Sequence, residues 1–168
     1  MLTVEQLCYG MMLPSGNDAA FALSEYFGQL LHDKKEIAVV STSQYSQFIN
    51  TPTKYFLKEM NFNAQKLNMT NTLYDSPHGL MNKSNYSSAH DQALLVAECM
   101  KITPFRRIVN TKVYETKPLN NNTKFPHLYR WENTNKLLGN MDGLIGTKTG
   151  ITNAAGSIEV LALPATTS

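Results

Sequence analysis

The sequence has little of several features that often decide a protein's class. It has two cysteines, one tryptophan and a net charge of only +2 over 168 residues. This small charge argues against nucleic-acid binding, because phosphate contacts need clustered Lys and Arg. No apolar run approaches the roughly 18 residues that a membrane-spanning helix needs. We therefore expect neither a nucleic-acid partner nor a membrane span.

The sequence also gives little indication of a metal site or a disulfide bond. Cys8 and Cys99 both fall in segments with helical apolar periodicity, and we interpret them as buried free thiols rather than a disulfide. His32, His90 and His127 have no ligand-like spacing to cysteine or acidic side chains, which zinc sites require. We expect no metal and no cofactor.

What the chain does have is enough apolar sequence for a core, with 42% hydrophobic and 17% charged residues, and a length typical of one domain. Capping and proline signals predict several helices, and alternating apolar residues predict a few strands. The predicted helices cover 3–13, 17–31, 51–60 and 88–101, with a short one from 103. The predicted strands cover 112–116, 144–148 and 156–163, and a turn at 152–155 joins the last two. Segment 36–40 could be a strand or a helical turn, 63–87 and 117–127 are predicted loops, and 133–138 is a helical turn or loop.

The most informative motif is Lys148-Thr149-Gly150. A lysine beside a hydroxyl at a strand edge can hold a carboxylate, and the glycine lets a substrate backbone come close. The tripeptide alone has little specificity, because an exposed strand edge often carries a lysine that prevents aggregation. A second element, Ser15 and Asn17, stands where a helix begins. Taken alone, Ser15 would be a helix N-cap and Asn17 a turn residue.

Five segments of the chain follow one another in an informative order. They are Tyr9 to Ala20 with its Ser-x-Asn, His78-Gly79-Leu80, Tyr86 to Asp91, Asn133 to Leu138, and Asp142 to Gly150 with Ala155-Gly156. Together they resemble the low-molecular-weight penicillin-binding proteins, which are serine-type D-alanyl-D-alanine carboxypeptidases. Residues 32–55 match this family least, and we interpret them as an insertion.

The resemblance implies an α+β fold of the β-lactamase/transpeptidase-like type, in which helices cover an antiparallel sheet. This chain would supply mainly the helical subdomain and one or two strands of the sheet. We expect residues 1–168 to form one partial domain, with no second domain. A capping-box pattern at residues 3–6 and a strand at 157–163 with no partner strand following it suggest a fragment, which needs an upstream segment or another chain to complete the fold.

The resemblance also implies roles for single residues. Ser15 would relay a proton toward the leaving amine, and Asn17 would point at the substrate amide. Lys148 would supply positive potential, and Thr149 would bind the terminal carboxylate. The implied ligands are D-Ala-D-Ala peptides or β-lactams, and the family's location outside the cytoplasmic membrane implies an extracytoplasmic protein.

The remaining implied elements concern the reacting carbonyl. The backbone N–H of Ile151, which follows Gly150, would form half of an oxyanion hole, and the nucleophile's own N–H would form the other half. In this family the nucleophile belongs to an S-x-x-K motif. No serine of this chain has a lysine three positions later. We therefore expect this chain to be inactive on its own.

Several interpretations remain open. The chain could belong to a carboxypeptidase that cleaves a terminal D-alanine through an acyl-enzyme, or to a degenerate, non-catalytic member that serves as a binding or structural subunit. A class A-like β-lactamase or esterase is less favoured, because the segments at His78 and at Tyr86 are typical of carboxypeptidases. We interpret His78 as a loop-fixing residue. Tyr129-Arg130-Trp131 is either a recognition patch or a cluster that packs against a loop.

Overall fold

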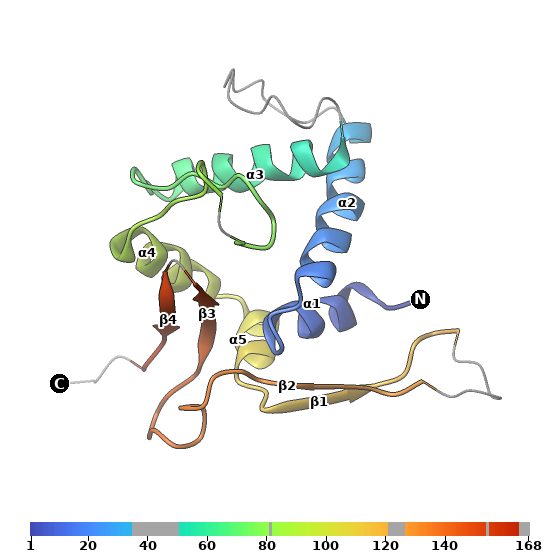
Figure 1. Cartoon of the computed structure of the whole chain (residues 1–168), viewed down its shortest axis with the longest axis vertical. Helices are drawn as coiled ribbons and strands as arrows, with labels where there is room; N and C mark the ends of the chain where they lie inside the picture. Colours follow the sequence, from blue (N-terminus) through green and yellow to red (C-terminus); the bar gives the residue numbers. More distant parts are fainter. Residues whose placement is uncertain (35–50, 81, 121–126, 154, 165–168) are drawn as a thin grey trace. The chain divides into compact units, whose positions relative to one another are not determined.

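The computed structural model describes residues 1–34, 51–80, 82–120, 127–153 and 155–164. Contacts divide the chain into two compact units, one formed by Met1–Ala19 with Val96–Ser168 and the other by Ala20–Leu95. In the described ranges the elements follow the order α1 (Val4–Met12), α2 (Asn17–Lys34), α3 (Pro52–Lys66), α4 (Ala89–Cys99), α5 (Thr103–Val109), β1 (Val113–Thr116), β2 (Tyr129–Glu132), β3 (Thr147–Thr152) and β4 (Gly156–Leu161) (Figure 1).

Helix α1 begins with the predicted capping box. The Thr3 hydroxyl accepts the Gln6 backbone N–H at 3.1 Å, and the Gln6 side chain accepts the Thr3 N–H at 2.8 Å. The Gln6 amide also donates to Thr116 Oγ1 at 2.6 Å and to the Lys117 carbonyl at 3.0 Å. The same buried side chain therefore caps α1 and ties it to the end of β1.

The core of the first unit is built on α1. Buried Tyr9 and Leu13 pack with Ile108 of α5. Tyr114 of β1 and Trp131 of β2 pack against this cluster from the neighbouring hairpin. Because aromatic side chains bury large apolar areas, these contacts hold the hairpin against the helix.

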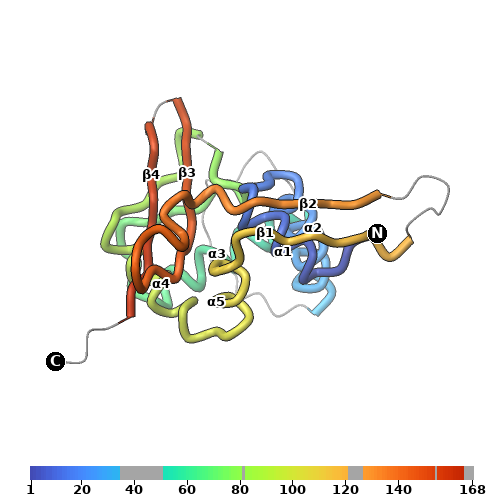
Figure 2. The backbone as a smooth tube through the Cα atoms, turned by 90° about the horizontal axis from the view of Figure 1, so that it is seen from below, coloured from blue at the N-terminus to red at the C-terminus, as the bar shows by residue number. Residues whose placement is uncertain are grey.

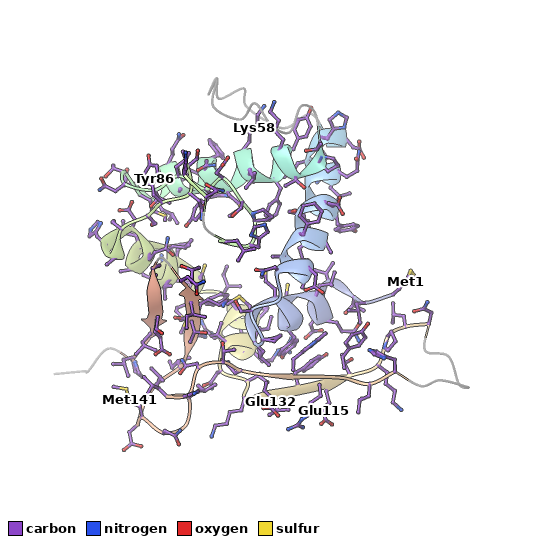
Figure 3. The ribbon with its side chains drawn as sticks, viewed as in Figure 1. Met1, Lys58, Tyr86, Glu115, Glu132 and Met141 are labelled. Carbon is purple, nitrogen blue, oxygen red and sulfur yellow. The ribbon has the colours of Figure 1, made fainter. Side chains whose placement is uncertain are left out.

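Strand β2 is a correction to the sequence prediction, which gave residues 129–131 no strand. β2 pairs antiparallel with β1, with Tyr114 opposite Trp131 (Figure 2). Glu115 and Glu132 lie on the face of this hairpin that is turned away from α1 (Figure 3), and both form ion pairs with Arg130, at 2.6 and 2.9 Å. Aromatic residues inside and charged residues outside give the alternation of a half-buried strand, but four residues are too few to establish it from sequence.

The second hairpin joins β3 and β4 in antiparallel register, with Lys148 opposite Val160 (Figure 2). The expected strand 144–148 is therefore displaced, because Lys148-Thr149-Gly150 lies inside β3 and not at its end. Gly146 is the reason. Its φ of +74° breaks the extended backbone, and a Cβ there would lie 2.5 Å from the Val109 carbonyl oxygen. A residue with a side chain would be strained at this position and would clash.

In the second unit, α2 and α3 cross at Gly28. A Cβ at this position would lie 1.9 Å from the Pro52 carbonyl oxygen, so the two backbones are in direct contact. Helix α3 continues to Lys66 and not to residue 60 as predicted. The Asn61 side chain ties α3 to the loop that follows it, since its amide donates to the Tyr74 carbonyl at 2.7 Å and its oxygen accepts the Tyr74 N–H at 2.8 Å.

Helix α4 begins as predicted, with the Ser88 hydroxyl accepting the Asp91 N–H at 3.2 Å. The predicted loop between α3 and α4 is present, and His78 Nδ1 accepts the Leu80 N–H at 3.1 Å there, which supports its loop-fixing role. The uncertain segment 36–40 and most of the proposed insertion 32–55 lie outside the described residues. Both thiols are free, as expected, but Cys8 and Cys99 are half-buried and not fully buried.

Candidate active site

Two of the predicted site residues, 133 positions apart in the sequence, meet in the first unit. The Lys148 ammonium donates to Ser15 Oγ at 2.7 Å and to the Thr149 carbonyl at 2.6 Å. Lys148 comes from β3, and Ser15 lies in the connection between α1 and α2. Ser15 is exposed and Lys148 is half-buried, so a ligand can reach the pair from solvent.

The turn between α1 and α2 presents Ser15 in a strained conformation. Ser15 has a φ of +60°, a left-handed conformation that costs a non-glycine residue about 1 kcal/mol. The next N–H, that of Gly16, donates to the Gly10 carbonyl at 3.1 Å, and a Cβ at Gly16 would lie 2.6 Å from that oxygen. The close approach of these two glycines holds the turn that carries Ser15.

Lys148 is the principal charge of this site. Burial lowers the pKa of its ammonium, because partial removal from water disfavours the charged form. Both of its hydrogen-bond acceptors are neutral oxygens. Across the described ranges, none of the ion pairs involves Lys148. Its positive charge is therefore not neutralised by a neighbouring carboxylate and can attract an anionic ligand.

Thr149 has a partner that sequence reasoning did not identify. Its Oγ1 lies 2.5 Å from Thr134 Oγ1. Thr134 in turn is held by the end of α1, since its N–H and its hydroxyl both donate to the Leu13 carbonyl, at 3.1 and 3.2 Å. In the sequence, residues 133–138 were notable only as a segment that precedes the lysine motif. No sequence pattern indicated that Thr134 would contact Thr149.

Asparagine side chains hold the turn that carries Thr134. The Asn133 amide donates to the carbonyls of Val109 and Thr111, at 3.2 and 3.1 Å. Its side-chain oxygen accepts the N–H of Asn135 at 2.9 Å. The buried Asn135 oxygen then accepts two further backbone N–H groups of the turn, at 2.9 and 3.2 Å. These bonds fix Thr134 between the end of α1 and β3.

The other predicted residues lie beside this cluster and are open to solvent. Asn17 is exposed at the first residue of α2, and Gly150 and Ile151 are exposed in β3. A Cβ at Gly150 would meet no atom within 4 Å, and Ile151 is 78% exposed. The structure thus brings Ser15, Lys148 and Thr149 together, and it leaves open space along the strand beyond them.

Two further features bear on the kind of site. Within the ranges that the structure describes, no three His, Cys, Asp or Glu side chains gather as they would around a metal ion. None of the helices in these ranges is long and apolar enough to cross a bilayer. The side-chain groups that meet at this site are an ammonium and hydroxyls.

Solved structures of DD-peptidases share this fold. The Streptomyces K15 DD-transpeptidase matches 96% of this chain with a TM-score of 0.76 and 35% sequence identity. A mutant of the same enzyme matches 97% with a TM-score of 0.79 and 36% identity. The class is therefore an α+β protein of the β-lactamase/transpeptidase-like fold, as predicted.

Sequence comparison narrows the class to a family. The profile of peptidase family S11, D-alanyl-D-alanine carboxypeptidase, matches residues 38–166. The D-alanyl-D-alanine carboxypeptidase of Streptomyces sp. (strain K15) is 38% identical over 149 residues, which cover 89% of this chain. DacF of Bacillus subtilis (strain 168) is 31% identical over 154 residues, which cover 92%. The chain belongs to the D-alanyl-D-alanine carboxypeptidase family, which confirms the resemblance.

The matches cover less of the relatives than of this chain. The aligned region spans 46% of the Streptomyces carboxypeptidase and 33% of DacF. It spans 56% of the crystallised K15 chain. These relatives therefore contain long segments that have no counterpart in the sequence described here.

Proposed function

We propose that this chain supplies the ligand-clamping part of a serine D-Ala-D-Ala carboxypeptidase site, which cleaves the terminal D-alanine of peptidoglycan-type peptides through an acyl-enzyme. The observation that carries the proposal is the 2.7 Å contact between Lys148 Nζ and Ser15 Oγ, with Thr149 next to the lysine in β3. Family membership supports the reaction class. Because the chain spans about half of its relatives or less, the activity belongs to the longer protein.

The direction of the Lys148–Ser15 hydrogen bond supports proton relay by Ser15. An ammonium has only donors, so Ser15 Oγ accepts this bond through a lone pair. The hydroxyl proton of Ser15 is then free to point toward a ligand. In the proposed reaction Ser15 passes this proton to the leaving amine as general acid and takes up the proton that the attacking nucleophile gives up. The neighbouring ammonium makes the Ser15 hydroxyl more acidic.

The proposed substrate contacts follow along β3. Thr149 and the charge of Lys148 bind the terminal carboxylate, and Asn17 donates to the peptide carbonyl from the start of α2. Gly150 leaves room for the substrate backbone, because no protein atom lies within 4 Å of the place where a Cβ would be. The backbone N–H of Ile151 stabilises the tetrahedral oxyanion, a role worth about 3 kcal/mol per donor in related chemistry.

The nucleophile is proposed to come from outside this sequence. No serine here is followed by lysine three positions later, whereas acylation in this family uses an S-x-x-K serine. We therefore propose that an upstream segment or another chain completes the site. The 168-residue chain alone is then expected to form no acyl-enzyme and to hydrolyse no D-Ala-D-Ala peptide.

A fluorescent penicillin tests the proposal on the full-length gene product. The expected result is a covalent adduct on the wild-type protein, formed at least tenfold more slowly after Lys148→Ala. Lys83→Ala, which removes an exposed lysine from the second unit, serves as the matched control and should label at the wild-type rate. Absence of any adduct would overturn the enzymatic proposal.

The absence of an S-x-x-K serine from this chain also favours a second candidate, a non-catalytic subunit that binds the same ligands. It predicts reversible binding of a D-Ala-D-Ala peptide, weakened by Lys148→Ala, with no covalent labelling by penicillin. Isothermal titration calorimetry on the same proteins separates this outcome from the enzymatic one.

A further inference from the structure

The hydroxyl of Thr134 stands between two oxygen atoms of the first unit. On one side it donates to the Leu13 carbonyl, 3.2 Å away, and on the other it lies 2.5 Å from Thr149 Oγ1. Thr134 is exposed on the turn between β2 and β3. It therefore connects the end of α1 with the residue that is proposed to hold the ligand carboxylate.

A count of protons sets the direction of these bonds. Each threonine hydroxyl has one proton and two lone pairs, and a carbonyl can only accept. The bond to Leu13 uses the single hydroxyl proton of Thr134. As long as Thr134 donates to Leu13, the 2.5 Å contact is donated by Thr149. In this state Thr149 points its proton at Thr134 and offers only lone pairs to a ligand.

A carboxylate ligand requires the opposite arrangement, because a carboxylate is only an acceptor. Thr149 must turn its proton toward the ligand, and Thr134 must then donate to Thr149. This reversal leaves the Leu13 carbonyl paired, since the Thr134 backbone N–H still donates to it at 3.1 Å. The exchange therefore leaves no buried acceptor unsatisfied, which keeps its energetic cost small.

We propose that Thr134 is a positioning residue for carboxylate recognition and acts through Thr149. Its hydroxyl reverses direction when a ligand carboxylate binds, so that Thr149 becomes a donor whose bond is strengthened by a second hydroxyl behind it. The proposal rests on the proposed role of Thr149. In addition to that role, part of the site's preference for ligands with a free carboxylate is assigned to Thr134, which does not touch the ligand.

The test compares a penicillin with its methyl ester, which has the same β-lactam ring but no free carboxylate. The acylation rate of each compound is measured on the full-length protein, and the readout is the ratio of the two rates. Thr134→Val keeps the shape and the backbone N–H but removes the hydroxyl. We expect it to lower the ratio by roughly fivefold, whereas Thr134→Ser should retain the wild-type ratio.

The double variant Thr134→Val/Thr149→Val decides whether Thr134 acts through Thr149. If it does, the double variant has the ratio of Thr149→Val alone, since the second change removes nothing more. A wild-type ratio in Thr134→Val, or independent effects of the two changes, would overturn the inference. A wild-type protein that does not distinguish the acid from the ester would instead overturn the proposed role of Thr149. Thermal unfolding of each variant separates misfolding from altered recognition.

Discussion

The ring of Tyr9 in α1 lies flat on the ring of Tyr114 in β1, with centroids 3.8 Å apart and an interplanar angle of 2°. Tyr9 is buried and Tyr114 is half-buried. This stacked pair adds to the contacts of Trp131 and Gln6 that hold the helix leading to Ser15 against the first hairpin. Disturbing the pair should affect the site indirectly, by loosening the end of α1.

Tyr114→Ala is therefore expected to lower the free energy of unfolding by about 2 to 3 kcal/mol, below the roughly 3 to 5 kcal/mol for truncating a buried aromatic side chain, because Tyr114 is only half-buried. Tyr114→Phe retains the ring and should change the stability by less than about 1 kcal/mol. Urea unfolding monitored by circular dichroism measures both. Equal stability of the two variants would mean that the ring stacking contributes little.

Gly150→Ala should separate ligand approach from folding. A Cβ at this position meets no protein atom within 4 Å, so the melting temperature should stay within about 1 °C of wild type. The methyl group would nevertheless occupy space proposed for the substrate backbone. Penicillin acylation of the full-length protein should then fall by about tenfold or more.

Gly16→Ala provides the contrasting case. A Cβ at this position would lie 2.6 Å from the Gly10 carbonyl oxygen, and backbone cannot move aside as easily as a flexible side chain. The clash should lower the free energy of unfolding by roughly 1 to 3 kcal/mol. It should also displace Ser15, which the turn carries. A lowered melting temperature together with slower acylation is expected. An unchanged melting temperature would contradict the role assigned to this glycine contact.

The pH dependence of acylation should follow Lys148. Burial lowers the pKa of its ammonium, so the side chain loses its charge at a lower pH than an ordinary lysine. The acylation rate is expected to decline on the alkaline side before pH reaches the usual lysine pKa of about 10.4. Lys148→Arg retains its charge to far higher pH, and any residual activity should show no such decline. Rates measured between about pH 6 and 10 check this.

Stability in acid should depend on Asp91, which is fully buried in the second unit. Burial alone would raise the pKa of this carboxyl. Hydrogen bonds from Thr72 Oγ1 at 2.7 Å and from the Asn71 N–H at 2.8 Å outweigh that effect and lower the pKa. A lowered folded-state pKa stabilises the fold above the unfolded pKa of about 3.9, and the stabilisation is lost as pH falls through the folded value.

Asp91→Asn should therefore destabilise the protein at neutral pH and make its stability less sensitive to pH below about 4. Melting temperatures between about pH 3 and 7 measure both effects. Asp33→Asn, which changes an exposed carboxylate, is the control and should follow the wild-type curve. Parallel curves for Asp91→Asn and wild type would show that another group controls the acid transition.

Short-range signals could be predicted from the sequence, and long-range contacts could not. The caps at Thr3 and Ser88 depend on residues three positions away, so the local pattern contains them. Strand β2 exists because it pairs with β1 and packs on α1, and its four residues give little periodicity. The contact of Thr134 with Leu13 joins residues 121 positions apart, and no local rule predicts it.

The same distinction applies to the site. Ser15, Lys148 and Thr149 belong to segments that resemble known motifs, so their roles could be suggested before any geometry was known. The structure added the distances and a partner for Thr149. The bounds of β3 were wrong because Gly146 adopts a positive φ, and periodicity alone does not reveal that conformation.

The first unit is assembled from both ends of the described chain, with residues 20–95 between them. During synthesis, at a rate of 5 to 20 residues per second, β3 emerges roughly ten seconds after α1. For most of that interval, until α5 and then the first hairpin have been made, the apolar side chains of α1 lack the partners that these elements supply. The first unit therefore cannot form until the last-made part of the described chain is present, and the contact between Lys148 and Ser15 joins its two separately made parts.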